Sequence, residues 1–173
     1  FFFKQKTAYE IPKRDWSSDV CSSDLFKPGS EPASAKARLQ MLRLALAGQA
    51  RYEVDTQEVT RGGVSYTIDT VRDYRRRFPD ARLFWLIGAD HVAKLPQWRD
   101  AAELAGSVEF LVIPRPGEPS VPFPAPFRGA MLQGFPLGVS SSQIRARVKA
   151  GLPVELLTGP VVAEAIRANR LYL

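Results

Sequence analysis

Two short, nearly continuous apolar runs constrain the fold of this chain most strongly: ARLFWLIG at residues 81–88 and SVEFLVIP at residues 107–114. Runs of this length are typical of strands that are buried on both faces in a parallel sheet covered by helices. Helical patterns alternate with these runs, and weaker strand patterns accompany them. We predict helices at residues 35–48, 65–80, 89–106 (broken at Pro96), 140–151 and 159–173, and further strands at residues 51–59 and 129–135.

The alternation of strands with helices predicts an α/β fold built on a mostly parallel, doubly wound sheet. Sheets of this kind bind ligands just beyond the carboxyl ends of their strands. We therefore expect the functional residues to follow the buried strands and to lie where helices begin, along one rim of the sheet.

Composition narrows the class of protein. The formal net charge is +6, and residues 1–25 hold four basic and four acidic residues, so the excess lies in residues 26–173. Such an excess suits a polyanionic ligand such as a nucleotide, although a soluble, arginine-rich surface would give the same number. No apolar run approaches the roughly 20 residues of a membrane span. The single cysteine, Cys21, excludes an internal disulfide, and a cytoplasmic setting is the default expectation.

Residues 1–25 show no helical or strand period, and serine and aspartate dominate their second half. We predict a disordered tail here and treat residues 26–173 as the domain. Lys4–Ile11 and Asp15–Leu25 also resemble in-frame translations of the two parts of a common sequencing-library adapter. This segment is accordingly expected to be non-native and is left out of the fold prediction.

Polar and aromatic residues follow the first buried strand. In the stretch IGAD, Gly88 permits close approach of a ligand and Asp90 can accept hydrogen bonds from ribose hydroxyls. The alternative is a strand-end turn whose aspartate caps the next helix. In LPQWR, Trp98 can stack on a heteroaromatic ring, or it can be an ordinary core residue.

Two predicted helix starts are rich in hydroxyl groups. In VSSSQIR, Ser140 and Ser141 begin a helix and Arg145 follows one turn later, an arrangement that favours phosphate. In SYTIDT, Tyr66 and Thr67 begin another helix. Simple helix capping explains either stretch equally well. Arg115, directly after the second buried strand, is a candidate clamp for a phosphate or carboxylate.

The chain has one histidine, His91, and no cysteine cluster accompanies it, so the sequence supports neither a metal site nor a serine–histidine–acid set. We predict a surface or helix-start position for this residue. The basic run YRRRF at residues 74–78 falls late in a predicted helix, where positive charge complements the helix dipole, and we interpret it as structural.

Several motifs occur in order along residues 26–173: KPGSEPASAKARLQML, SYTIDT, FWLIGADHVAKLPQW, VIPRPG, VSSSQIRARV and EAIRANRLY. Together they resemble the bacterial nicotinate-nucleotide adenylyltransferase family. The resemblance implies a Rossmann-like fold and the transfer of an adenylyl group from ATP to nicotinate mononucleotide, which gives deamido-NAD and pyrophosphate in NAD biosynthesis. It also implies Mg²⁺ bound with ATP as cofactor, and neither nucleic acid nor membrane as partner.

The resemblance further implies residue roles. Ser140, Ser141 and Arg145 would hold the ATP phosphates. Trp98 would stack on the nicotinate ring, the groups around Tyr66 and Thr67 would meet its carboxylate, and Asp90 would contact ribose. Arg115 and Lys27 would lie near phosphate.

One departure from the family is large. The family carries a glycine-rich turn and a His-x-Gly-His motif after its first strand, and this sequence contains no such motif. We therefore expect a truncated domain that lacks its first strand, its first helix and its catalytic histidines, that is inactive, and that is marginally stable or aggregates. Two further readings stay open: a basic nucleic-acid-binding α/β module and a non-catalytic nucleotide sensor.

Overall fold

The computed structural model describes residues 2–5, 16–19, 33–114, 116–117, 121–133 and 138–173. These residues form two compact units: Phe1–Ser23 with Ala50–Leu137, called unit 1, and Asp24–Gln49 with Gly138–Leu173, called unit 2. Unit 1 contains β1 (Phe2–Gln5), β2 (Trp16–Asp19), β3 (Tyr52–Asp55), α2 (Gln57–Arg61), α3 (Thr67–Arg77), β4 (Arg82–Gly88), the 3₁₀ helix η1 (Ala89–Gln97), α4 (Ala101–Ser107), β5 (Glu109–Ile113) and β6 (Gly129–Met131). Unit 2 contains α1 (Ala35–Ala45), α5 (Ser141–Lys149), α6 (Glu155–Thr158) and α7 (Pro160–Ala168).

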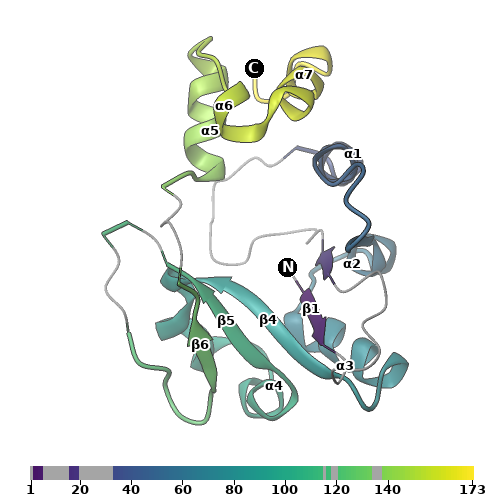
Figure 1. The fold of residues 1–173 in the computed structure, drawn as a ribbon, viewed down its shortest axis with the longest axis vertical. Coiled ribbons are helices and arrows are strands. Elements are labelled where there is room, and N and C mark those ends of the chain that lie inside the picture. Colours follow the sequence, from purple (N-terminus) through teal and green to yellow (C-terminus); the bar gives the residue numbers. More distant parts are fainter. Residues whose placement is uncertain (1, 6–15, 20–32, 115, 118–120, 134–137) are drawn as a thin grey trace. The chain divides into compact units, whose positions relative to one another are not determined.

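The described strands of unit 1 form one sheet in the order β3-β2-β1-β4-β5-β6 (Figure 1). The pairs β2–β3, β4–β5 and β5–β6 are parallel, whereas β1 runs antiparallel to both of its neighbours. The predicted mostly parallel α/β sheet is therefore confirmed. Both apolar runs form strands in the middle of it, and β4 and β5 pair with Trp85 opposite Phe110.

Strands β1 and β2 lie in the segment, residues 1–25, for which the sequence predicts a disordered, non-native tail. Phe2–Gln5 pairs with β4, and Trp16–Asp19 pairs with β3. Backbone N–H and C=O groups of a sheet strand need partners, and β1 provides them along the edge of β4. The tail prediction missed these strands because their sequences carry no clear period of two.

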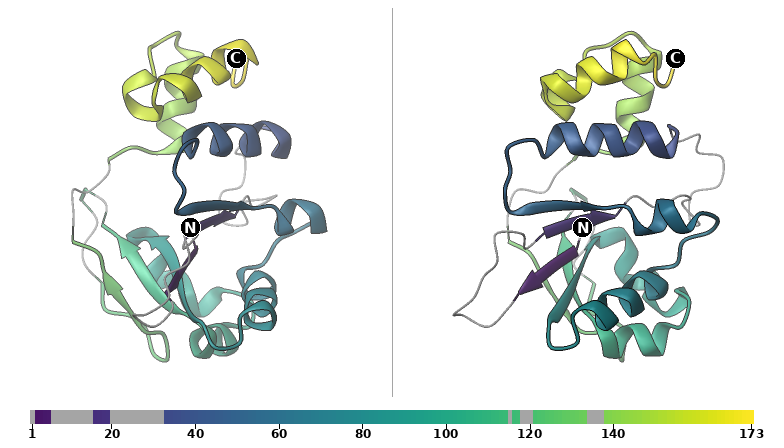
Figure 2. Two further views of the ribbon diagram at one scale, coloured as in Figure 1. Left: turned by 45° about the vertical axis from the view of Figure 1, so that its right-hand side comes forward. Right: turned by 90° about the vertical axis from the view of Figure 1, so that its right-hand side faces the viewer.

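The core of unit 1 lies between the sheet and its helices. Figure 2 shows α3 and α4 beside each other against the sheet. As predicted, Ile68, Val71 and Tyr74 of α3 face inward, and all three are buried. They join the core residues Leu83, Leu95, Leu104, Phe110 and Val112. Burial of each such side chain contributes about 1.5–3 kcal/mol, which makes this the main stabilising feature of unit 1.

Three elements differ in detail from the predictions. The strand predicted at residues 51–59 ends at Asp55, because the Asp55 carboxylate accepts a hydrogen bond from the Gln57 N–H at 2.8 Å and a short helix, α2, follows. The helix at residues 89–106 divides into η1 and α4, as the break at Pro96 predicts. Helix α6 is an element that the sequence analysis did not predict.

Unit 2 is helical in its described part. Helix α1 begins where the sequence places its cap, since the Ser34 side chain accepts a hydrogen bond from the Ala37 N–H at 3.2 Å. A small core forms around Val154, Ala163 and Ile166, with Met41 and Ile144 packed against it. Helix α7 begins with Pro160 at its first turn, the position where a missing N–H costs least.

Candidate functional site

The site begins where β4 ends and η1 starts. Asp90 is the second residue of η1, which places its side chain just beyond the carboxyl end of a buried parallel strand. Its Oδ2 lies 3.5 Å from Nε2 of His91, and both side chains are partly buried, with 27% and 21% exposure. The aspartate therefore lies at the predicted rim, with the only histidine of the chain beside it.

Trp98 directly follows η1 and contacts His91. Its indole packs edge-on against His91, with ring centroids 6.1 Å apart, and against the buried Phe110 at 6.3 Å. The indole Nε1 is buried and has no hydrogen-bond partner in the described part of the chain. Trp98 thus packs against the core of unit 1, and its stacking on a heteroaromatic ring stays a prediction.

Tyr66 and Arg99 extend this group. The guanidinium carbon of Arg99 lies 4.4 Å from the centre of the Tyr66 ring, a cation–π contact. Tyr66, rather than Ser65 or Thr67, is the N-cap residue of α3, and it makes no side-chain capping hydrogen bond. Thr67 is the first residue of the helix, so its backbone N–H is among those that lack an intrahelical acceptor.

The structure places the predicted residues Asp90, Trp98 and Tyr66 of unit 1 in two groups of contacts. Asp90 contacts His91, His91 contacts Trp98, and the next residue, Arg99, stacks on Tyr66. We call these five residues the unit 1 cluster. The first group offers a carboxylate, an imidazole and an indole, and the second a phenol and a guanidinium. Groups of these types recognise aromatic rings, hydroxyl groups and anions.

The predicted phosphate residues lie at the start of α5 in unit 2. Ser140 and Gln143 form a capping box: the Gln143 N–H donates to Ser140 Oγ at 3.2 Å, and the Ser140 N–H donates to Gln143 Oε1 at 3.0 Å. The capping alternative is therefore confirmed for Ser140, although its hydroxyl hydrogen has no acceptor within the described residues.

Other groups at the start of α5 are available to a ligand. Ser141 is exposed at the first helical position. Arg145 donates to Ser142 Oγ at 3.3 Å and forms no ion pair with any described residue. The free amides of the first turn, the helix dipole and this guanidinium all favour an anion.

Two predicted residues, Lys27 and Arg115, lie outside the described residues. Three residues that contact predicted site residues were not identified from the sequence. Arg99 stacks on Tyr66, Ser142 accepts a hydrogen bond from Arg145, and Gln143 forms the capping box with Ser140. The sequence analysis also assigned His91 no role. For Gln143 a signal was present, since serine followed three residues later by glutamine is the capping-box pattern. Arg99 gave no such signal, because its contact is with a residue distant in sequence.

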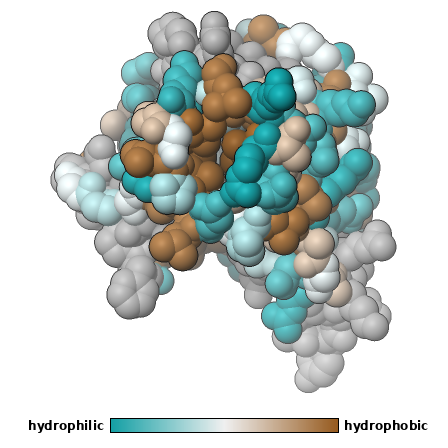
Figure 3. All heavy atoms as spheres, turned by 90° about the horizontal axis from the view of Figure 1, so that it is seen from above, coloured by the Kyte–Doolittle hydropathy of each residue, from teal (hydrophilic) through white to brown (hydrophobic). Residues whose placement is uncertain are grey.

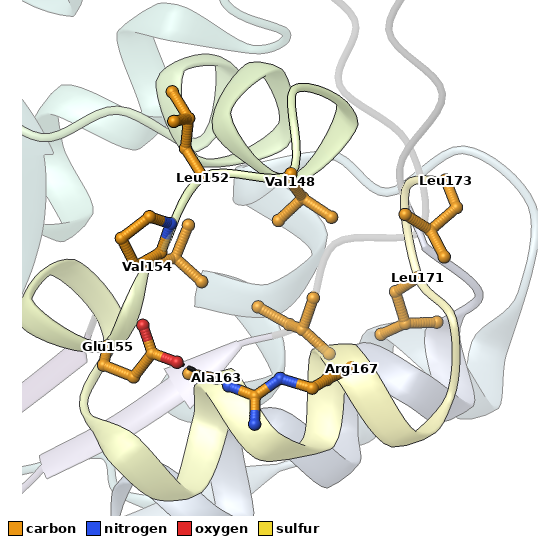
Figure 4. A pocket seen from close by; sticks show the side chains of 11 residues that line it. Val148, Leu152, Val154, Glu155, Ala163, Arg167, Leu171 and Leu173 are labelled. Atoms are coloured by element: carbon orange, nitrogen blue, oxygen red, sulfur yellow. Dashed lines mark hydrogen bonds and ion pairs between the residues drawn. The ribbon is translucent and has the colours of Figure 1, made fainter.

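A separate pocket of about 390 Å³ lies within unit 2 (Figure 4). Its walls are mainly apolar, among them Val148, Leu152 and Leu171, and the Glu155–Arg167 ion pair lies at its side. Figure 3 shows apolar side chains gathered on the face that it draws. Within unit 2, the side chains of Leu152, Leu156, Val161 and Leu173 are exposed. Ser140, Ser141 and Arg145 do not line this pocket, so it is distinct from the predicted phosphate site.

Comparison with known proteins first defines a class. Residues 7–147 match the family model described as cytidylyltransferase-like. Solved structures of Plasmodium falciparum nicotinic acid mononucleotide adenylyltransferase, one complexed with APC and one with NaAD, share the fold. Each gives a TM-score of 0.71 and covers 90% of this chain and 81% of that chain, at 15% and 14% sequence identity.

Curated relatives then identify the family within that class. A probable nicotinate-nucleotide adenylyltransferase of Opitutus terrae is 38% identical over 150 residues, which are 85% of this chain and 76% of the relative. The corresponding protein of Methylacidiphilum infernorum is 38% identical over 157 residues, 88% of this chain and 74% of the relative. The corresponding protein of Kineococcus radiotolerans is 40% identical over 141 residues, which are 81% of this chain and 68% of the relative. The chain belongs to the nicotinate-nucleotide adenylyltransferase family.

Two features are absent from the described residues. None of their helices is both long enough and apolar enough to cross a membrane. No group of three or more histidine, cysteine, aspartate or glutamate side chains among them is arranged to hold a metal ion.

Proposed function

We propose that this chain binds nicotinate mononucleotide and ATP as the two substrates of adenylyl transfer. The observation that carries the proposal is in the unit 1 cluster: Asp90, just beyond the carboxyl end of β4, contacts His91, and His91 contacts the Trp98 indole. Family membership supports the same substrates. Ligands of parallel α/β sheets bind at this end of the strands.

The unit 1 residues are assigned to the pyridine nucleotide. Trp98 packs against the nicotinate ring, and Asp90 accepts hydrogen bonds from ribose hydroxyls. The backbone N–H and hydroxyl groups around Tyr66 and Thr67 meet the ring carboxylate, which the uncapped start of α3 favours electrostatically. Lys27 and Arg115 are assigned to phosphate on the family resemblance.

The α5 residues of unit 2 are assigned to the ATP phosphates. Ser141 provides a backbone N–H and a hydroxyl, Ser140 provides its hydroxyl hydrogen, and Arg145 provides a guanidinium that no described carboxylate occupies. A planar guanidinium binds phosphate oxygens through two parallel hydrogen bonds.

The reaction needs no covalent intermediate with the protein. An oxygen of the 5′-phosphate of nicotinate mononucleotide attacks the α-phosphorus of ATP, and the bond to the leaving pyrophosphate breaks in line with the attack. The side chains position the two substrates and stabilise developing negative charge. We assign Mg²⁺ to the triphosphate of ATP, since phosphate oxygens are ligands that this ion prefers.

Calorimetric titration of the chain with ATP tests the phosphate assignment. We expect Arg145→Gln to weaken ATP binding about tenfold, the effect of losing one charge-assisted contact of about 1.4 kcal/mol. Arg43→Gln is the control, because Arg43 is an exposed arginine of α1 in the same unit. Equal ATP affinity for wild type and Arg145→Gln would reject the assignment.

Measurement of pyrophosphate release distinguishes an active adenylyltransferase from a nucleotide sensor and from a nucleic-acid-binding module. A nucleotide sensor would bind both substrates without releasing pyrophosphate. The sequence analysis expects the same of this chain, because its sequence contains no His-x-Gly-His motif, so release of pyrophosphate would reject both expectations. A nucleic-acid module would need exposed aromatic side chains on which bases can stack. Phe84 and Trp85 do not provide them, because both are buried in β4.

A further inference from the structure

His91 connects the core of unit 1 to the carboxylate of Asp90. Its imidazole lies edge-on to the Trp98 indole, with ring centroids 6.1 Å apart, and its Nε2 lies 3.5 Å from Asp90 Oδ2. The indole in turn packs against Phe110, which is fully buried in β5. A row of contacts therefore runs from the sheet to a carboxylate that lies just beyond the carboxyl end of β4.

The chemistry of histidine suits both of these contacts. An imidazole that carries a proton on Nε2 can donate it to a carboxylate oxygen while the ring packs against an indole. The distance of 3.5 Å between Nε2 and Oδ2 is longer than an ordinary N–H···O hydrogen bond, and distances of this kind often shorten when a ligand binds. Because His91 and Asp90 are both partly buried, water screens this interaction only in part.

We propose that His91 is a positioning residue, which holds the Asp90 carboxylate in the orientation that accepts hydrogen bonds from the ribose hydroxyls. The inference rests on the proposed function, since it requires the ribose of nicotinate mononucleotide to lie at Asp90. A carboxylate that is already oriented loses less conformational freedom on binding than one that rotates freely. His91 thus acts on the ligand through Asp90, and Trp98 holds the imidazole in place.

Equilibrium binding of two ligands tests this inference without requiring turnover: nicotinate mononucleotide and its 2′,3′-dideoxy analogue, which lacks both ribose hydroxyls. We expect wild type to bind nicotinate mononucleotide more tightly than the analogue. His91→Phe keeps a ring beside Trp98 but has no N–H donor. It should weaken binding of nicotinate mononucleotide about three- to tenfold, the effect of losing one hydrogen bond, and leave binding of the analogue within about twofold.

Gln97→Ala is the matched control. Gln97 is the exposed last residue of the same helix, η1, so its replacement should leave binding of both ligands within about twofold of wild type. His91→Gln supplies an N–H donor without the ring, and it should retain more of the preference for nicotinate mononucleotide over the analogue than His91→Phe does.

A double-mutant cycle tests whether His91 acts through Asp90. When Asp90→Asn is already present, His91→Phe should weaken binding of nicotinate mononucleotide by no more than about twofold, because the carboxylate that it positions is absent. Fully independent effects of the two substitutions would overturn the inference.

The remaining outcomes separate the inference from the proposed function. Equal weakening of both ligands by His91→Phe would show that the imidazole supports the fold or a part that the two ligands share, and would overturn the inference. Unchanged binding of both ligands, or a wild type that does not distinguish them, would also overturn it while binding of the two substrates stands. Failure of wild type to bind nicotinate mononucleotide would overturn both.

Discussion

At the scale of single residues, aromatic side chains join the core of unit 1 to its candidate site. Phe110 is fully buried and contacts Trp98 on one side and Phe127 on the other, with ring centroids 6.3 Å and 5.7 Å away. Edge-to-face contacts of this kind fix the orientation of the rings beyond what burial alone achieves. The core therefore sets the position of the indole that we assign to the nicotinate ring.

Gly129, at the start of β6, allows the close approach of the strand to Phe110. A Cβ atom there would overlap the carbonyl oxygen of Phe110 and lie 2.6 Å from Cζ of Phe123. We expect Gly129→Ala to lower the free energy of unfolding by about 2 kcal/mol or more, the typical effect of overpacking a core. Urea denaturation measures the change.

Gly106→Ala provides the comparison. Gly106 lies in α4, and a Cβ atom there would meet nothing within 4 Å. Alanine is favoured over glycine in a helix by about 0.5–1 kcal/mol, so this variant should be as stable as wild type or more stable. If both glycine variants were equally stable, the tight contact at β6 would be disproved.

At the scale of elements, the end of β3 is tied to α3 through one carboxylate. Asp55 Oδ2 accepts hydrogen bonds from the Tyr74 hydroxyl at 2.6 Å and from the Arg77 guanidinium at 2.9 Å. Burial alone would raise the pKa of Asp55, but these hydrogen bonds, the Gln57 N–H and the charge of Arg77 together lower it from its ordinary value of 3.8. Arg77 also stacks on the Tyr74 ring, with its guanidinium carbon 4.3 Å from the ring centre.

This lowered pKa predicts how stability depends on pH. Since the folded pKa of Asp55 lies below the unfolded one, its contribution is fully present above the unfolded value of about 4 and is lost as pH falls through the folded pKa. We expect Asp55→Asn to cost about 1.5–3 kcal/mol at pH 7, the usual range for hydrogen bonds to a charged group. The difference from wild type should shrink below about pH 4.

Thermal unfolding at pH 7 and at pH 3 measures this dependence. Asp80→Asn is the control, because Asp80 is exposed after the end of α3 and should change stability by no more than about 0.5 kcal/mol. An Asp55→Asn penalty of the same size at both pH values would contradict the explanation.

The sequence predicted elements better than contacts. Strands β4 and β5 followed from their apolar runs, and helices α1, α3, α5 and α7 followed from their caps and periods. The antiparallel strand β1 did not, because strand direction depends on pairing between distant segments. Asp90 and Trp98 could be identified from the sequence because they follow the apolar run of β4. The contact of Arg99 with Tyr66 could not, because it joins two distant segments.

At the scale of the whole molecule, the described residues form two units that carry different parts of the proposed chemistry. Unit 1 holds the cluster of Tyr66, Asp90, His91, Trp98 and Arg99 around the carboxyl end of β4. Unit 2 holds Ser140, Ser141 and Arg145 at the start of α5. The expectation that both groups share one rim of the sheet stays a prediction, as does the single domain over residues 26–173.

Binding of nicotinate mononucleotide at Trp98 is the step on which the proposed function depends. Calorimetric titration of wild type should show saturable binding, and Trp98→Leu should weaken it about tenfold or more, since stacking of one ring contributes about 1–3 kcal/mol. ATP affinity of the same variant should be unchanged, which shows that unit 2 remains folded. Nucleotide binding that is equally tight in wild type and in Trp98→Leu would contradict the site described for this chain.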